Sequence, residues 1–163
     1  MRGADLSHAY LKDAYLVETD LRRGILCKTC LEGADLTKAH LEESYLTEAN
    51  LERAILRGAF LEKAFLKQTL LKKTNFIETD LRETTFLGID LGKVKGLTIR
   101  QLTEEPSPYL CAIALPEDFI TIEPYRNCEQ IPKILAERDS RLSITDAKAL
   151  VNHTVDTWKS QKS

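Results

Sequence analysis

Two cysteines are the residues whose types and spacing most directly suggest chemistry. Cys27 and Cys30 stand in the motif LCKTCL, and the CxxC spacing is typical of a redox pair or of half a metal site. A second CxxC is missing, because Cys111 and Cys128 lie seventeen residues apart. We therefore interpret Cys27 and Cys30 as surface thiols, with a disulfide between them as the geometrically feasible alternative.

Asp20 and His40 are the second candidate, and their chemistry depends on whether the chain returns to the same place every twenty residues. A metal ion needs more ligands than these two side chains supply. We therefore expect a simple charged or hydrogen-bonded pair. The sequence also lacks a nucleophile–base arrangement, a glycine-rich phosphate loop and HExxH. We therefore predict that the protein is not an enzyme and that it has no catalytic, cofactor-binding or metal-binding residues.

Composition limits the class of protein and of partner. The 163 residues are 43% hydrophobic and carry 23 basic and 25 acidic side chains. This balance argues against a nucleic-acid partner, and no apolar run reaches the roughly 18 residues of a membrane helix. The first residues lack the apolar region of a secretory signal. The sequence predicts a cytoplasmic protein, or a periplasmic or thylakoid-lumen one if a signal segment was removed.

A period of five residues dominates the first half of the chain. A large apolar residue recurs at every fifth position from Leu6 to Leu91, eighteen times in all, and only Phe76 and Phe86 are not leucine. A small residue, mostly Ala or Thr, stands two positions before each of these centres, and only Ile89 breaks that series.

This period excludes both a helix and a straight strand. In a helix, successive centres would drift by about 140° and cover every side. In a straight strand they would alternate between faces, because five is odd. The chain must therefore turn once in each repeat, with the centre and the small residue facing inward and the residue between them facing outward.

The motifs GADLS, GADLT, EANLE and ETDLR resemble those of pentapeptide repeat proteins, whose pattern is A(D/N)LXX. The resemblance implies an all-β solenoid, a right-handed quadrilateral β-helix with four repeats per coil. Eighteen repeats would then make about four and a half coils, roughly 22 Å long. It also implies that residues twenty apart stack in columns, such as Leu26, Leu46 and Leu66.

The pattern ends near GKVKGLTIRQL, and all five prolines lie between 106 and 132. We expect a β-helix over 2–95 and a mixed, partly helical capping segment over 96–163. Thr98 and Gln101 form a capping box that predicts a short helix near 99–105. Helical turns are expected at 132–138 and 144–158, with an irregular or part-extended stretch between. GLTIRQL resembles the segment that follows the repeats in cyanobacterial members.

Several outward positions are apolar where Asp or Asn is usual, and they form the candidate interaction surface. These residues are Ile25, Tyr45, Ile55, Phe60, Phe65 and Leu70. Three interpretations stay open: coverage by the C-terminal segment, an interface with a partner or second copy, and tolerated exposure.

The sequence favours a scaffold or protein-interaction module whose protein partner is unknown. The alternative, given only by the resemblance, is a DNA-mimicking protein that binds gyrase and protects it from quinolones. Such mimicry needs a strongly acidic rod, whereas residues 1–95 carry 15 basic and 15 acidic side chains. The first coil has no visible cap, and we expect a homodimer or another segment to cover it.

Overall fold

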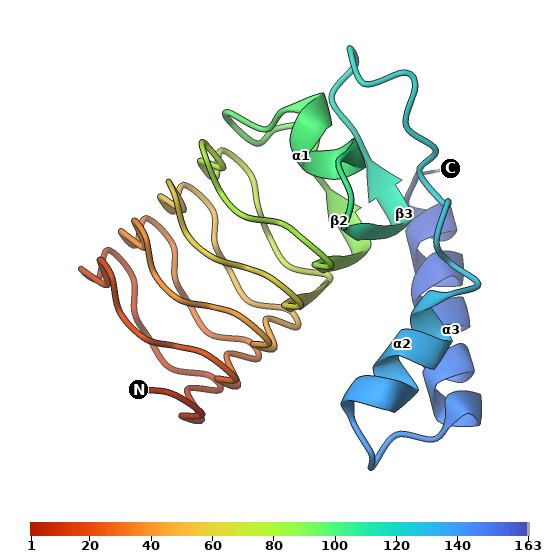
Figure 1. Cartoon of the computed structure of the whole chain (residues 1–163), viewed down its shortest axis with the longest axis horizontal. Helices are drawn as coiled ribbons and strands as arrows, with labels where there is room; N and C mark the ends of the chain where they lie inside the picture. Colours follow the sequence, from red (N-terminus) through yellow and green to blue (C-terminus); the bar gives the residue numbers. More distant parts are fainter. Residues whose placement is uncertain (163) are drawn as a thin grey trace.

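A computed structural model describes residues 1–162 as a β-solenoid followed by a helical hairpin (Figure 1). Parallel β-bridges join residues twenty apart from Asp5↔Ile25 to Asn75↔Lys95. The predicted twenty-residue register is therefore confirmed. Four five-residue repeats make one coil, and each coil presents four walls.

The inward and outward positions follow the five-residue pattern. The leucine centres from Leu21 to Leu66 have no exposed surface, and Phe76 and Phe86 are equally buried above them. Ala, Ser and Thr fill the small inward slots beside them. Dense packing of this kind leaves the axis of the solenoid filled by side chains.

Each repeat turns where the chain passes from one wall to the next. The amide of Ala39 donates to the carbonyl of Leu36 at 3.0 Å across such a turn. Lys38, between them, has φ +54°, which is the conformation that the third residue of a type II turn requires. Gly33 and Gly58 occupy the equivalent place in other repeats with φ +68° and +62°.

The inward threonines make a contact that the preference for a small residue at this position did not predict. Four consecutive repeats place Thr69, Thr74, Thr79 and Thr84 at the small position. Their hydroxyls donate to leucine carbonyls of the preceding coil at 2.7–2.8 Å. These threonines therefore tie adjacent coils together as well as filling space.

Two longer strands lie on the wall that the later chain joins. They are β1 (Phe65–Lys67) and β2 (Thr85–Asp90), paired in parallel with Phe65 opposite Thr85. After α1 (Ile99–Thr103), strand β3 (Tyr109–Ala114) pairs in parallel with β2. The segment expected to be irregular or part-extended thus contributes one more parallel strand to this wall.

Two helices follow β3 and stand beside the same wall (Figure 1). They are α2 (Ile131–Arg138) and α3 (Ile144–Lys162). The short α1 has the predicted capping box, in which the hydroxyl of Thr98 accepts from the amide of Gln101. A second buried cluster joins Phe65, Leu87 and Cys111 to Ile131 and Leu135 of α2 and to α3.

Thr84 and Thr85 provide a matched pair of substitutions in β2 and beside it. Both are fully buried, but only the Thr84 hydroxyl has a partner, the carbonyl of Leu61 at 2.8 Å, whereas the Thr85 hydroxyl has none among the described residues. Thr84→Val should lower the unfolding free energy by about 1 kcal/mol, and Thr85→Val should leave it unchanged or raise it. Chemical denaturation checks both, and equal losses in the two variants would contradict these assignments.

Candidate functional site

The candidate site is a groove between one wall of the solenoid and the α2–α3 hairpin. Its volume is about 550 Å³. Tyr45 and Phe65 line it from the solenoid, and Leu135, Leu142 and Leu150 line it from the hairpin. Tyr45 and Phe65 occupy the same outward column, because they are paired twenty residues apart, and their rings meet edge to face at 6.3 Å.

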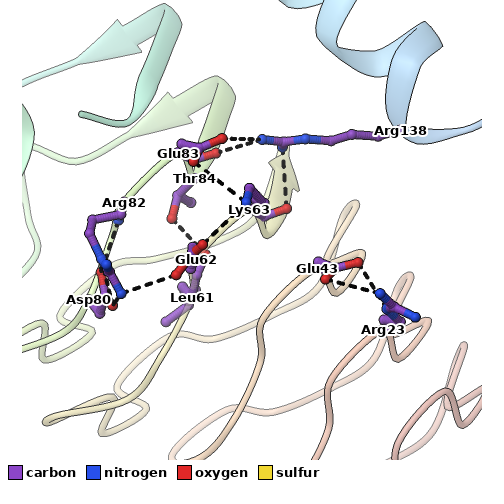
Figure 2. Close-up of polar contacts among 10 residues, drawn as sticks. All are labelled: Arg23, Glu43, Leu61, Glu62, Lys63, Asp80, Arg82, Glu83, Thr84 and Arg138. Carbon is purple, nitrogen blue, oxygen red and sulfur yellow. Dashed lines mark hydrogen bonds and ion pairs between the residues drawn. The ribbon is translucent and has the colours of Figure 1, made fainter. Parts of the chain in front are cut away.

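A ladder of alternating charges runs along the turn beside this wall (Figure 2). Arg23 Nε lies 2.9 Å from Glu43 Oε2, and Lys63 Nζ lies 3.6 Å from Glu83 Oε1. Residues at these positions stack because each coil is twenty residues long. Cations and anions alternate along the column, so the rim of the groove carries both signs.

Arg138 at the end of α2 extends this ladder from the hairpin (Figure 2). Its guanidinium donates to the backbone carbonyls of Lys63 and Glu83, both at 3.3 Å. It also lies 3.6 Å from the Glu83 carboxylate and 5.9 Å from the centre of the Tyr109 ring. One side chain therefore links the hairpin to two coils.

Neighbouring groups shift the pKa values of two residues that line the groove. The hydrogen bond to Glu62 and the charges of Glu83 and Glu62 raise the pKa of Lys63, so its ammonium stays charged. Burial raises the pKa of the Tyr45 phenol, and the Asp139 carboxylate adds to this shift. Lys63 therefore contributes a positive charge to the rim of the groove, and Tyr45 contributes a neutral phenol.

The structure separates the six residues of the candidate interaction surface. Phe65 is only 8% exposed, because α2 and α3 pack over its wall, and Tyr45 is half-buried beside it. For Phe65, the structure therefore supports the first of the three interpretations left open by the sequence, which is coverage by the C-terminal segment. Ile25, Ile55, Phe60 and Leu70 remain 36–52% exposed, each on a different wall.

Phe60 has the most defined surroundings of these exposed residues. Its ring stacks on the ring of His40, with centroids 4.8 Å apart and planes 12° apart. The column that contains Asp20, His40, Phe60 and Asp80 is formed as expected. The side chains of Asp20 and His40 bind other partners, however: the Asp20 carboxylate lies 2.7 Å from the Arg22 guanidinium, and His40 Nδ1 lies 3.0 Å from the Glu42 carboxylate.

The cysteines agree with the sequence-based interpretation in one pair and add a disulfide in the other. Cys27 and Cys30 are free, partly exposed thiols, as interpreted from the sequence, and the alternative Cys27–Cys30 disulfide is wrong. Burial raises the pKa of Cys27, which disfavours the reactive thiolate form. The disulfide instead joins Cys111 in β3 to Cys128, just before α2. Sequence spacing gave no signal for this pair, because the fold alone brings the two positions together.

The sequence analysis also did not identify Arg138 and the three leucines of the hairpin as residues of the groove. Nothing in the five-residue pattern indicates which wall a later segment contacts.

Within residues 1–162, no cluster of three or more His, Cys, Asp and Glu side chains could hold a metal ion. Over the same residues, none of the helices combines the length and apolar character that a membrane crossing requires.

A family model described as pentapeptide repeats matches this chain in eight copies, over residues 1–42, 34–72 and 61–95. The matched residues make up more than half of the chain. No match was found among curated proteins.

Several solved structures of similar proteins were found. A pentapeptide repeat protein from the Arabidopsis thaliana thylakoid lumen is 29% identical, with a TM-score of 0.35, over 53% of this chain and 67% of that one. HetL, a pentapeptide repeat protein involved in heterocyst differentiation regulation in the cyanobacterium Nostoc, is 27% identical, with a TM-score of 0.41, over 71% of this chain and 53% of HetL. QnrB1, a plasmid-mediated fluoroquinolone resistance protein, is 16% identical, with a TM-score of 0.31, over 69% of this chain and 73% of that one.

The disulfide should hold the hairpin in place without supporting the solenoid. Closing a loop of seventeen residues stabilises a fold by about 3 kcal/mol in the chain-entropy model. Reduction, or Cys111→Ala with Cys128→Ala, should accelerate amide hydrogen exchange in α2 and α3 and leave the leucine centres of the early coils protected.

Cys27→Ser with Cys30→Ser is the matched control, because these thiols are free. It should leave exchange in the hairpin unchanged. Equal acceleration throughout the chain on reduction would show that the disulfide supports the whole fold, contrary to this expectation.

Proposed function

Because this chain belongs to the pentapeptide repeat family, we propose that it is a non-catalytic protein-interaction module. Proteins of this family form right-handed β-helix solenoids and are generally non-catalytic. Eighteen repeats at four per coil correspond to about four and a half coils. We propose that residues 2–95 form the β-helix and that residues 96–163 form the segment that covers its later end.

The observation that carries this proposal is a group of three exposed apolar residues around one corner of the solenoid, on walls other than the one that the hairpin covers. Ile55 and Phe60 lie on adjoining walls of one coil, each 38% exposed. Ile77, 40% exposed, lies in the corresponding turn of the next coil. We call these three residues the corner patch. Its rigid backbone loses little conformational freedom on binding, which favours recognition of a preformed protein surface.

The charges of the solenoid support a protein partner over a nucleic-acid-like role. Residues 1–95 are electrically neutral, with 15 basic and 15 acidic side chains. Ion pairs between coils bring opposite charges together, as in Lys28–Glu48 and Lys12–Glu32. The DNA-mimicking alternative requires a continuous acidic surface, and no observation favours it.

The disulfide is an indication of the cellular compartment in which the protein resides. Structural disulfides persist in oxidising compartments and are rare in the cytosol. The Cys111–Cys128 bond therefore supports a periplasmic or lumenal setting over the cytoplasm that the first residues of the sequence suggested.

The test compares partner capture by the wild-type chain and by an Ile55→Ser, Phe60→Ser variant after chemical crosslinking in an extract of the source organism. Leu70→Ser is the matched control, because Leu70 is an exposed outward residue, 52% exposed, on another wall. A partner that binds the wild-type chain saturably should be captured about tenfold less, or less still, by the double variant. The control should capture as much of it as the wild type does.

Circular dichroism must show that all variants stay folded. Equal capture by the three proteins would overturn the assignment of binding to the corner patch. Protection of DNA gyrase from a quinolone in a supercoiling assay would favour the alternative function instead.

A further inference from the structure

Lysines without a carboxylate partner gather on one part of the solenoid. Nine of the fifteen basic side chains of residues 1–95 lie within 4 Å of a carboxylate. The other six form no ion pair within residues 1–162. Four of these six are exposed and lie close together in the last coils, namely Lys72, Lys73, Lys93 and Lys95.

Two carboxylates offset part of this charge, but only on the side toward α3. Lys72 and Lys93 line a cavity beside α3 that Glu52 and Asp90 also line. The other two lysines of the group are not among the residues that line this cavity. Their charges therefore belong to the adjoining wall of the solenoid, which carries Ile55.

On that wall, two lysines and two isoleucines surround Asn75. Parallel bridges place Ile55 one coil before Asn75 and Lys95 one coil after it, in the same outward column. Along the chain, Lys73 and Ile77 lie two residues to either side, each in a turn at one edge of the wall. The lysines and isoleucines are all exposed. We call these five residues the Asn75 face.

This wall has the dimensions of one helix. The extended chain from Lys73 to Ile77 spans at most about 13 Å, and a helix with its side chains is about 10–12 Å across. Coils repeat at roughly 4.8 Å and helical turns at roughly 5.4 Å, so successive turns of a helix can meet successive coils. The chain itself packs helices on another wall, where α2 and α3 cover Phe65.

The charges of the face select the chemistry of such a helix. Lysines on one side of the face are complementary to carboxylates, and isoleucines on the other side are complementary to apolar side chains. The Asn75 side-chain carbonyl accepts from the Ile77 amide at 3.0 Å, which leaves its NH2 group to donate to a carboxylate. The whole chain carries a net charge of −2, so a nucleic acid or an anionic membrane would also meet its acidic remainder.

We infer that the Asn75 face binds an amphipathic acidic helix of a partner protein. Acidic residues of that helix face Lys73 and Lys95, and its apolar residues face Ile55 and Ile77. The inference rests on the proposed function, because both isoleucines belong to the corner patch. It adds the chemistry of the partner, which the corner patch alone does not specify.

Titration of the isotope-labelled 163-residue chain with synthetic peptides, followed by NMR, tests the inference. One helical peptide carries leucines on one face and glutamates along the flank, and its twin carries lysines in place of the glutamates. The glutamate peptide should shift the amide resonances of residues 73–77 and 95–96 saturably, and about tenfold more weakly at roughly 500 mM salt than at roughly 50 mM. The lysine twin, and a glutamate peptide with proline at its centre, should not bind there.

Charge reversal identifies the lysines that take part. Lys73→Glu with Lys95→Glu should raise the dissociation constant of the glutamate peptide about tenfold or more. The turn accepts this change, because Glu43 takes φ +58° at the position equivalent to Lys73, where φ is +62°. Lys67→Glu with Lys148→Glu is the matched control, since neither lysine forms an ion pair within residues 1–162, and should leave the constant within about twofold.

Three outcomes overturn the inference. The first is the absence of saturable shifts with the glutamate peptide, or shifts outside the Asn75 face. The second is an equal loss of binding in the control, which would show that net charge rather than the face determines affinity. The third is tighter binding to phosphatidylglycerol vesicles or to a single-stranded oligonucleotide than to the peptide. Circular dichroism on each variant separates loss of binding from loss of the fold.

Partner capture in the extract separates this inference from the proposed function. Loss of the partner from the Ile55→Ser, Phe60→Ser variant, with full retention by Lys73→Glu with Lys95→Glu, would uphold the corner patch and overturn the acidic helix. Retention by the serine variant would overturn the proposed function, and the peptide titration would still decide the inference.

Discussion

The backbone ladder between coils twenty residues apart is the constraint on which the rest of this structure depends. Each outward residue binds back to the coil before it, while the residues on either side of it bind forward to the coil after it. The solenoid is therefore polar along its axis, and its two ends present different hydrogen-bonding patterns. This asymmetry explains why the later end accepts a parallel strand and a helix from the later chain.

The same ladder determines where side chains meet. Because a coil contains twenty residues, positions that are distant in sequence become neighbours in one column, as with Arg23 and Glu43 or His40 and Phe60. Local turns hold this spacing even where a non-glycine residue such as Lys38 must take a positive φ. Side chains that meet on the surface of this solenoid are thus often twenty residues apart in the sequence, rather than three or four as on a helix.

The sequence predicts the repeating half of the fold well because its information is local. The inward centres and the outward residues follow from the period of five, whereas the columns needed the four repeats per coil that the family resemblance implies, and the family match covers the same residues. Phe60 and Phe65 show where this reasoning ends. They occupy equivalent slots of adjacent repeats, yet Phe60 is 38% and Phe65 8% exposed. Their difference depends on which wall the α2–α3 hairpin contacts, and the repeat pattern contains no information about that contact.

The cysteines illustrate the same limit through chemistry. CxxC spacing brings Cys27 and Cys30 close along the chain, but a turn and a change of wall separate their backbone positions in the coil, and both stay free. Cys111 and Cys128 are joined because Asn127 anchors the turn before α2 to β3: the Leu110 amide donates to its side chain at 2.9 Å, and its own amide donates to the Leu110 carbonyl at 3.1 Å. These hydrogen bonds hold the two segments side by side, so the disulfide secures a contact that the backbone already makes. The hairpin is then held on its wall by the disulfide and by its contacts with solenoid residues such as Phe65 and Lys63, in addition to the axial stacking that stabilises the solenoid itself.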